Sequence, residues 1–150
     1  MKVTARRIGT CVLLLLGLTF APPLSAQSAG SSLKQQLIGH WQLVSVTVGE
    51  RTPYGAAPQG SMFLDAKGHL SVIVISDGDA RNISYFGTYT VDDATKSMTI
   101  HVDASSGGSG NAGGRSFKRL LQLQGNELVM ANEAPVGAPG VIKQTWKQAN

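Results

Sequence analysis

Short runs of alternating apolar and polar residues fill most of the chain after residue 40, and turn-forming residues separate them. Alternation with a period of two is typical of β-strands that bury one face. The pattern predicts eight short strands, at residues 41–48, 61–65, 69–76, 85–91, 97–103, 115–124, 127–131 and 141–147.

The segments between these strands have the composition of turns and loops. Gly68 and Gly125 fall where tight hairpin turns require a positive φ. Four longer segments are rich in Gly, Pro, Ser or Asp and are predicted to be loops, at residues 50–60, 76–82, 104–114 and 132–140. No internal repeat and no linker divides the chain into two domains.

A short helix is predicted just before the first strand. Ser32 is a suitable N-cap for residues 33–38, in which Leu33 and Leu37 share one side. Gly39 is expected to end this helix.

Most of the strands are neighbours in sequence, and this regular spacing favours an antiparallel sandwich or up-and-down barrel. Closing an eight-stranded sheet removes its exposed edges. We therefore predict an all-β fold, an eight-stranded antiparallel up-and-down barrel with a short N-terminal helix. Gly39 is expected to let the chain cross one end of the barrel, and Trp41 to plug that end from inside.

Several short motifs in the predicted strands resemble one known family. A Gly-x-Trp sequence opens the first strand within Leu37–Ser45, and Gly87-Thr88-Tyr89 lies in the fourth. The other motifs are Gly60-Ser61-Met62-Phe63-Leu64, Lys67-Gly68-His69-Leu70, the segment from Leu121 to Leu128, and the closing Trp146. In order and spacing they are similar to the bacterial lipocalin-like domain family, a calycin-type group of small β-barrels.

The resemblance covers residues 37 to about 148 and implies a lipocalin-like barrel with an internal pocket. The sequence departs from the family pattern at Lys67, at Gln148 and in the glycine-rich segment 104–114. The family pattern implies a fold and a pocket more firmly than it implies an activity.

The first 26 residues have the pattern of an export signal. Basic residues precede the apolar run 11–20, which is far shorter than the ~20 residues that a membrane-spanning helix requires. Ala26 offers a small residue at the expected cleavage site. We expect a periplasmic or secreted protein with a leader at residues 27–36, a barrel domain at residues 37–150 and no stable membrane span after cleavage. A retained membrane anchor is the alternative.

Charge and cysteine content change once the signal is removed. Three of the 13 basic residues, Lys2, Arg6 and Arg7, lie in the signal, which leaves a net charge near +1. Such a weak charge does not suggest binding to nucleic acid. The single cysteine, Cys11, also lies in the signal, so the exported chain has neither a disulfide nor a thiol nucleophile.

Motifs that carry catalysis or cofactor binding are weak in this sequence. The G-x-G-x-x-G pattern at residues 108–113 precedes an alternating strand rather than a helix, so it does not suggest a dinucleotide site. The acidic residues at 77–79 lack the glutamate of a calcium loop. His40, His69 and His101 are scattered without metal-ligand spacing. We predict no cofactor, no metal and no catalytic residue.

Arg119 is the most informative polar residue. Alternation places it on the same face as Phe117 and Leu121, which we expect to point into the barrel. An unpaired buried arginine is costly, so it requires an anion, a carboxylate partner or water. We predict that Arg119 binds the polar end of an amphipathic ligand, with Tyr85, Tyr89, Phe117 and Leu121 around it. The alternative is that Arg119 extends to the rim or pairs internally.

These patterns predict an exported barrel that binds a small, largely apolar molecule, and they favour a binding protein over an enzyme. Two alternatives stay open: a cyclase- or isomerase-type enzyme that uses the barrel cavity, and an envelope protein-interaction module whose barrel is filled by side chains. An interior without a cavity on the order of a few hundred Å³ would favour the filled barrel.

Overall fold

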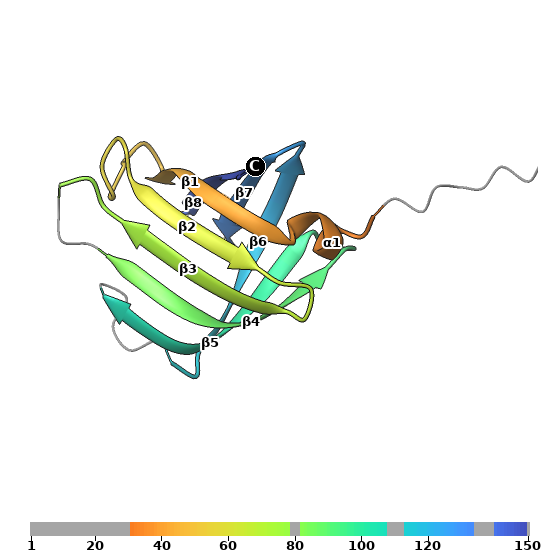
Figure 1. Ribbon diagram of the computed structural model, residues 1–150. Coiled ribbons are helices and arrows are strands. Elements are labelled where there is room, and N and C mark those ends of the chain that lie inside the picture. Colours follow the sequence, from red (N-terminus) through yellow and green to blue (C-terminus); the bar gives the residue numbers. More distant parts are fainter. Residues whose placement is uncertain (1–30, 79–81, 108–112, 134–139, 150) are drawn as a thin grey trace, which may run out of the picture.

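The computed structural model describes residues 31–78, 82–107, 113–133 and 140–149 (Figure 1). The predicted export signal and its cleavage site lie outside these residues, as does most of the G-x-G-x-x-G pattern. The elements are α1 (Leu33–Leu37), β1 (Gly39–Val48), β2 (Gln59–Leu64), β3 (His69–Ile75), β4 (Ile83–Asp92), β5 (Ser97–Gly107), β6 (Ser116–Gln124), β7 (Glu127–Asn132) and β8 (Ile142–Gln148).

The strands form one closed barrel in which each strand pairs with its neighbour in sequence. Every pairing is antiparallel, and β8 closes the barrel by pairing with β1, for example Trp146 opposite Leu43. This confirms the predicted all-β, eight-stranded up-and-down barrel with a short N-terminal helix.

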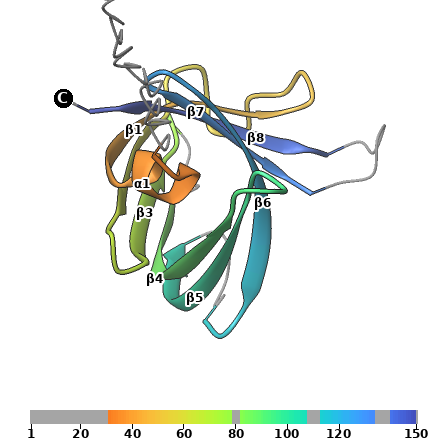
Figure 2. The ribbon, with the colours of Figure 1, turned by 90° about the vertical axis from the view of Figure 1, so that its right-hand side faces the viewer.

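The two ends of the barrel differ in how they are covered. The short turns β2–β3, β4–β5 and β6–β7 lie at the same end as α1, which sits across the barrel opening in Figure 2. We call this the closed end. The longer connections between the other strand pairs lie at the opposite end, which we call the open end.

Hydrogen bonds and packing hold α1 onto the closed end. Ser32 and Gln35 form a capping box at its N-terminus, and the Leu33 backbone N–H donates to Asp93 Oδ1 over 2.7 Å. The Trp41 indole Nε1 donates to the Leu37 carbonyl over 2.8 Å. Trp41 is fully buried, so helix and indole together fill this end.

The helix ends one residue earlier than predicted. Ile38 is its C-cap in an extended conformation, and Gly39 is the first residue of β1 rather than the terminator of the helix. Gly39 has φ +134°, which favours glycine, and a Cβ there would lie 3.4 Å from Nε2 of Gln148. The glycine therefore lets the chain turn directly from helix to strand.

Two β-bulges shift the inward-facing positions. In β1 the register against β8 shifts between Leu43 and Ser45, so Val46 is buried and Ser45 is not in the core. Strict alternation from Trp41 and Leu43 would have placed Ser45 on the inner face, and the bulge makes that interpretation wrong. In β5 the strand continues to Gly107, although residues 104–107 were predicted to be loop, because Ala104 to Gly107 pair with β4.

The core fills the closed end and the middle of the barrel. It contains both tryptophans and the inward side chains of every strand, among them Met62, Met98 and Leu128 with less than 1% exposure. Hollows remain on both sides of this core, one between α1 and β6 at the closed end and one inside the barrel nearer the open end.

Candidate functional site

A cavity of about 160 Å³ lies inside the barrel near the open end. It is the most enclosed hollow among those found in the described part of the chain. Its walls are mostly apolar, with a few polar groups. The lining residues are Tyr54, Val74, Ile83, Tyr85, Val102, Ser105, Phe117, Arg119, Ile142 and Gln144.

Three of the five residues predicted to bind a ligand meet at this cavity. Phe117 and Arg119 come from the inner face of β6, and Tyr85 comes from β4. The Tyr85 and Phe117 rings pack edge to face with centroids 5.8 Å apart, and the Arg119 guanidinium carbon lies 4.5 Å from the centroid of the Phe117 ring. These contacts make one aromatic wall with a cation against it.

The other two predicted residues lie elsewhere in the barrel. The Tyr89 side chain is buried toward the closed end, where its hydroxyl donates to the Asp65 carbonyl over 2.7 Å. Leu121 is mostly buried, opposite Met130 of β7, and lines a separate hollow beside α1 at the closed end. Neither residue lines the cavity.

The Arg119 guanidinium has few partners for its five donors. Its Nη1 donates to the Lys118 carbonyl over a long 3.4 Å, and no described carboxylate forms an ion pair with it. Burial lowers the pKa of Arg119, and the neighbouring Tyr85 opposes this shift. Because arginine stays protonated in proteins, a cation faces the cavity with unfilled donors.

Burial has the opposite effect on Tyr85, whose pKa it raises to about 12 while Arg119 pulls it down. The phenol is therefore neutral at physiological pH. In that form it presents an O–H donor and an aromatic wall beside the guanidinium, rather than a counter-ion that would neutralise it.

Sequence reasoning missed several lining residues. Ser105 faces inward because β5 bulges where the β4 register changes from Phe86 opposite Ala104 to Gly87 opposite Val102. Strict alternation from Val102 would have turned Ser105 outward. Gln144 could have been found, since it alternates with Trp146 on β8, whereas Tyr54 lies in a connection with no periodic signal.

Among the residues that the structure describes, two buried side-chain polar atoms have no hydrogen-bond partner. One is Oδ1 of Asn132, which lies directly opposite Arg119 in the β6–β7 pairing. The other is Nε1 of Trp146, two residues beyond Gln144 on β8. Buried polar groups are normally satisfied, and leaving one unpaired costs about 1–3 kcal/mol. Each of these unpaired atoms therefore lowers the free energy of unfolding of the unliganded protein.

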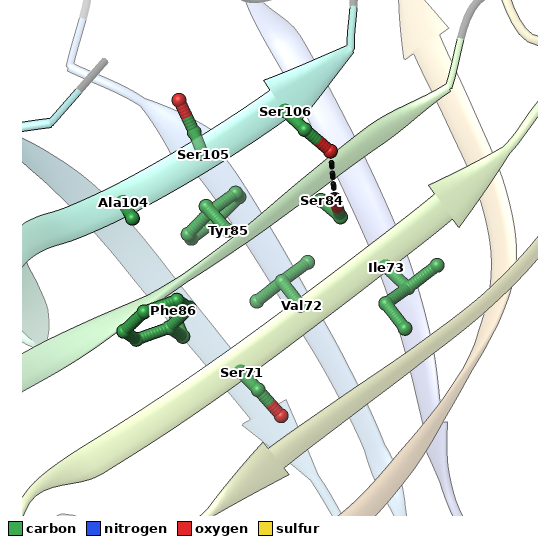
Figure 3. Close-up of a pocket in the computed structure, with 9 residues that line it drawn as sticks. All are labelled: Ser71, Val72, Ile73, Ser84, Tyr85, Phe86, Ala104, Ser105 and Ser106. Carbon is green, nitrogen blue, oxygen red and sulfur yellow. Dashed lines mark hydrogen bonds between the residues drawn. The ribbon is translucent and has the colours of Figure 1, made fainter. Parts of the chain in front are cut away.

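A larger hollow of about 350 Å³ lies on the outside of the barrel over β3, β4 and β5 (Figure 3). It is an open surface groove rather than an enclosed cavity. Ile73 and Phe86 are 48% and 55% exposed at its edges, and the hydroxyls of Ser84 and Ser106 are hydrogen-bonded over 2.7 Å. Volume alone therefore does not make this groove the better ligand site, because it would leave most of a small molecule in water.

Two further findings concern the described residues as a whole. No group of three or more His, Cys, Asp or Glu side chains among them is placed to hold a metal ion. None of their helices has the length and apolar character needed to cross a membrane.

Comparisons of this sequence with protein-family models and with curated proteins find no match. The resemblance to bacterial lipocalin-like domains therefore stays a prediction. Function has to be inferred from the barrel and from the cavity that Arg119 faces.

Proposed function

We propose that this chain is an exported, lipocalin-like protein that binds a small, largely apolar molecule with an anionic end in the cavity of the barrel. The observation that carries the proposal is the Arg119 guanidinium, which lines an enclosed apolar cavity with no described carboxylate to neutralise it. A bound anion would fill its donors with charge-assisted hydrogen bonds. The apolar walls would contribute affinity by burial.

The size of the cavity limits the ligand. An engineered apolar cavity of ~150 Å³ is large enough for benzene, whereas drug-sized molecules occupy pockets of ~300–1,000 Å³. At about 160 Å³, this cavity suits one ring or a short branched chain. A longer ligand would have to extend through the open end. We therefore expect ring-sized acids to be the largest molecules that fit entirely inside the cavity.

Binding rather than catalysis is the function that the lining supports. Among the described residues, the lining contains no carboxylate, histidine or cysteine that would act as a general base or nucleophile. A cyclase- or isomerase-type enzyme would have to act only by shaping its substrate. Nothing in the lining specifically favours that alternative.

We expect replacement of Arg119 by methionine to weaken benzoate binding by about 10- to 100-fold, because a hydrogen bond to a charged group contributes ~1.5–3 kcal/mol. Affinity for benzyl alcohol, which is neutral and of similar size, should change much less. Isothermal titration calorimetry measures both. Lys118→Met is the matched control, because Lys118 is the adjacent cation and pairs with Glu133 instead of lining the cavity.

Benzoate affinity that is equal in the native protein, Arg119→Met and Lys118→Met would overturn the role of Arg119. Equal losses in the two variants would also contradict it, since they would report only the net charge of the protein. A loss confined to Arg119→Met, and confined to the acid, supports the proposal.

The outer face of the barrel favours a second candidate, a module that associates with another copy of itself. Phe63, Ile73, Ile75 and Phe86 are each more than 40% exposed on adjacent strands β2 to β4. Residues 59–63, 71–75 and 84–90 contain no charged side chain, so two copies could approach face to face without charge repulsion.

Self-association through this face would be weakened by a single polar substitution. We expect Phe86→Ser to shift a dimer to monomer in sedimentation velocity, if the face is an interface. The exposed Leu120→Ser on β6 is the control, because it removes an exposed apolar side chain from a different strand. A native protein that is monomeric at hundreds of micromolar would rule this candidate out.

A further inference from the structure

Gln144 is a polar residue at a position where the barrel is otherwise apolar. It lies on β8 with Val46 of β1 opposite on one side and Met130 of β7 opposite on the other, and both neighbours are only 1% exposed. Its amide has no hydrogen-bond partner among the described residues, yet it lines the cavity. An amide that is partly withdrawn from water without a partner is destabilising, so its place calls for an explanation.

Gln144 and Arg119 line the cavity from different strands, with β7 between them. Gln144 lies opposite Met130 on β7, and Arg119 lies opposite Asn132 on the same strand. The cavity therefore has a cation on β6 and an uncharged amide on β8, two strands apart and offset by two residues.

Apolar side chains separate these two polar groups around the cavity. Val74, Val102 and Ile142 line it together with the Tyr85 and Phe117 rings. A ligand that filled this space with its carboxylate at Arg119 would bring another part of the molecule to the Gln144 amide. An amide offers both a donor and an acceptor, so it can pair with a hydroxyl or a carbonyl.

We infer that the ligand is bifunctional: a ring-sized acid that carries a second, uncharged hydrogen-bonding group such as a hydroxyl or carbonyl. This rests on the proposed function, since it assigns a second contact in the same cavity. The two polar groups on β6 and β8, which line the same cavity, carry the inference. Gln144 then determines specificity, because it favours hydroxylated acids over plain ones.

The experiment compares benzoate with 3-hydroxybenzoate and 4-hydroxybenzoate by isothermal titration calorimetry. One added neutral hydrogen bond is worth about three- to tenfold in affinity. We expect at least one hydroxybenzoate to bind the native protein more tightly than benzoate by that factor. In Gln144→Met, which keeps the side-chain length and removes the amide, the ratio of hydroxybenzoate affinity to benzoate affinity should fall to about one, whatever the change in benzoate affinity itself.

The thermal midpoint of Gln144→Met gives an independent readout that the variant is folded. Because the amide has no partner in the unliganded barrel, methionine should raise the midpoint of thermal unfolding. A lower midpoint would mean that the amide is already hydrogen-bonded inside the barrel, which contradicts the inference.

The titrations separate failure of this inference from failure of the proposed function. If benzoate binds in an Arg119-dependent way but neither hydroxyl improves affinity, the role of Gln144 is wrong and the acid-binding cavity stands. A hydroxyl advantage that persists in Gln144→Met also overturns the role of Gln144. If none of the three acids binds the native protein, the proposed function falls with it.

Discussion

Replacing Trp41 with alanine is expected to lower the free energy of unfolding by about 3–5 kcal/mol, the usual cost of truncating a buried large aromatic side chain. Trp41 has no exposed surface, and its indole fills the closed end beneath α1. The truncation would also leave the Leu37 carbonyl without its donor. Urea unfolding followed by circular dichroism measures the change.

Trp41→Phe is the matched control for this substitution. It keeps much of the ring volume but removes the Nε1 hydrogen bond, so the added cost from that bond should be about 1 kcal/mol. An alanine variant that loses less than ~1 kcal/mol would show that the indole does not seal the barrel. That result would contradict the assignment of α1 and Trp41 as a single plug.

Replacing Gly87 with alanine is expected to cost at least about 1–3 kcal/mol, the range for forcing extra atoms into a packed site. An ideal Cβ on Gly87 would overlap the His101 carbonyl oxygen and would lie 3.0 Å from the Asp103 nitrogen. Both atoms are backbone, so a side-chain rotation cannot relieve the clash. Urea unfolding again gives the free energy.

The same substitution should also disturb the cavity. Gly87 lies at the bulge that turns Ser105 inward, and Tyr85 is two residues away on the same strand. We expect Gly87→Ala to weaken benzoate binding as well as stability, whereas Thr88→Ala on the exposed face should change stability by less than ~1 kcal/mol and leave binding intact. A Gly87→Ala variant as stable as the native protein would show that the bulge does not depend on this glycine.

The strands could be predicted because the alternation of apolar and polar residues follows the alternation of buried and exposed side chains. All eight strands were expected from residues such as Leu43, Met98 and Ile100, and the order of turns made neighbour pairing the simplest closure. The inward position of Arg119 also followed from alternation with Leu121. These features depend on the order of residues within each strand, so they can be predicted from a single sequence.

The location of the open space could not be predicted in the same way. Tyr89 and Leu121 face inward as expected, but they lie away from the cavity because strand stagger and α1 decide which inward positions meet the cavity. Bulges in β1 and β5 interrupt the alternation, so Val46 rather than Ser45 is buried, and Ser105 lines the cavity although residues 104–114 were predicted to be a loop. The position of the cavity and the two bulges depend on how neighbouring strands pair. The sequence of one strand alone does not predict them.

The most direct test of an acid-binding cavity at the open end is a benzoate titration followed by ¹H–¹⁵N correlation spectra of the native protein. Saturable shifts should concentrate on backbone amides around the cavity, at Tyr85, Ser105, Phe117 and Arg119. Shifts confined to the outer groove, at Ser71 and Ile73, or the absence of any saturable shift at millimolar benzoate, would contradict it.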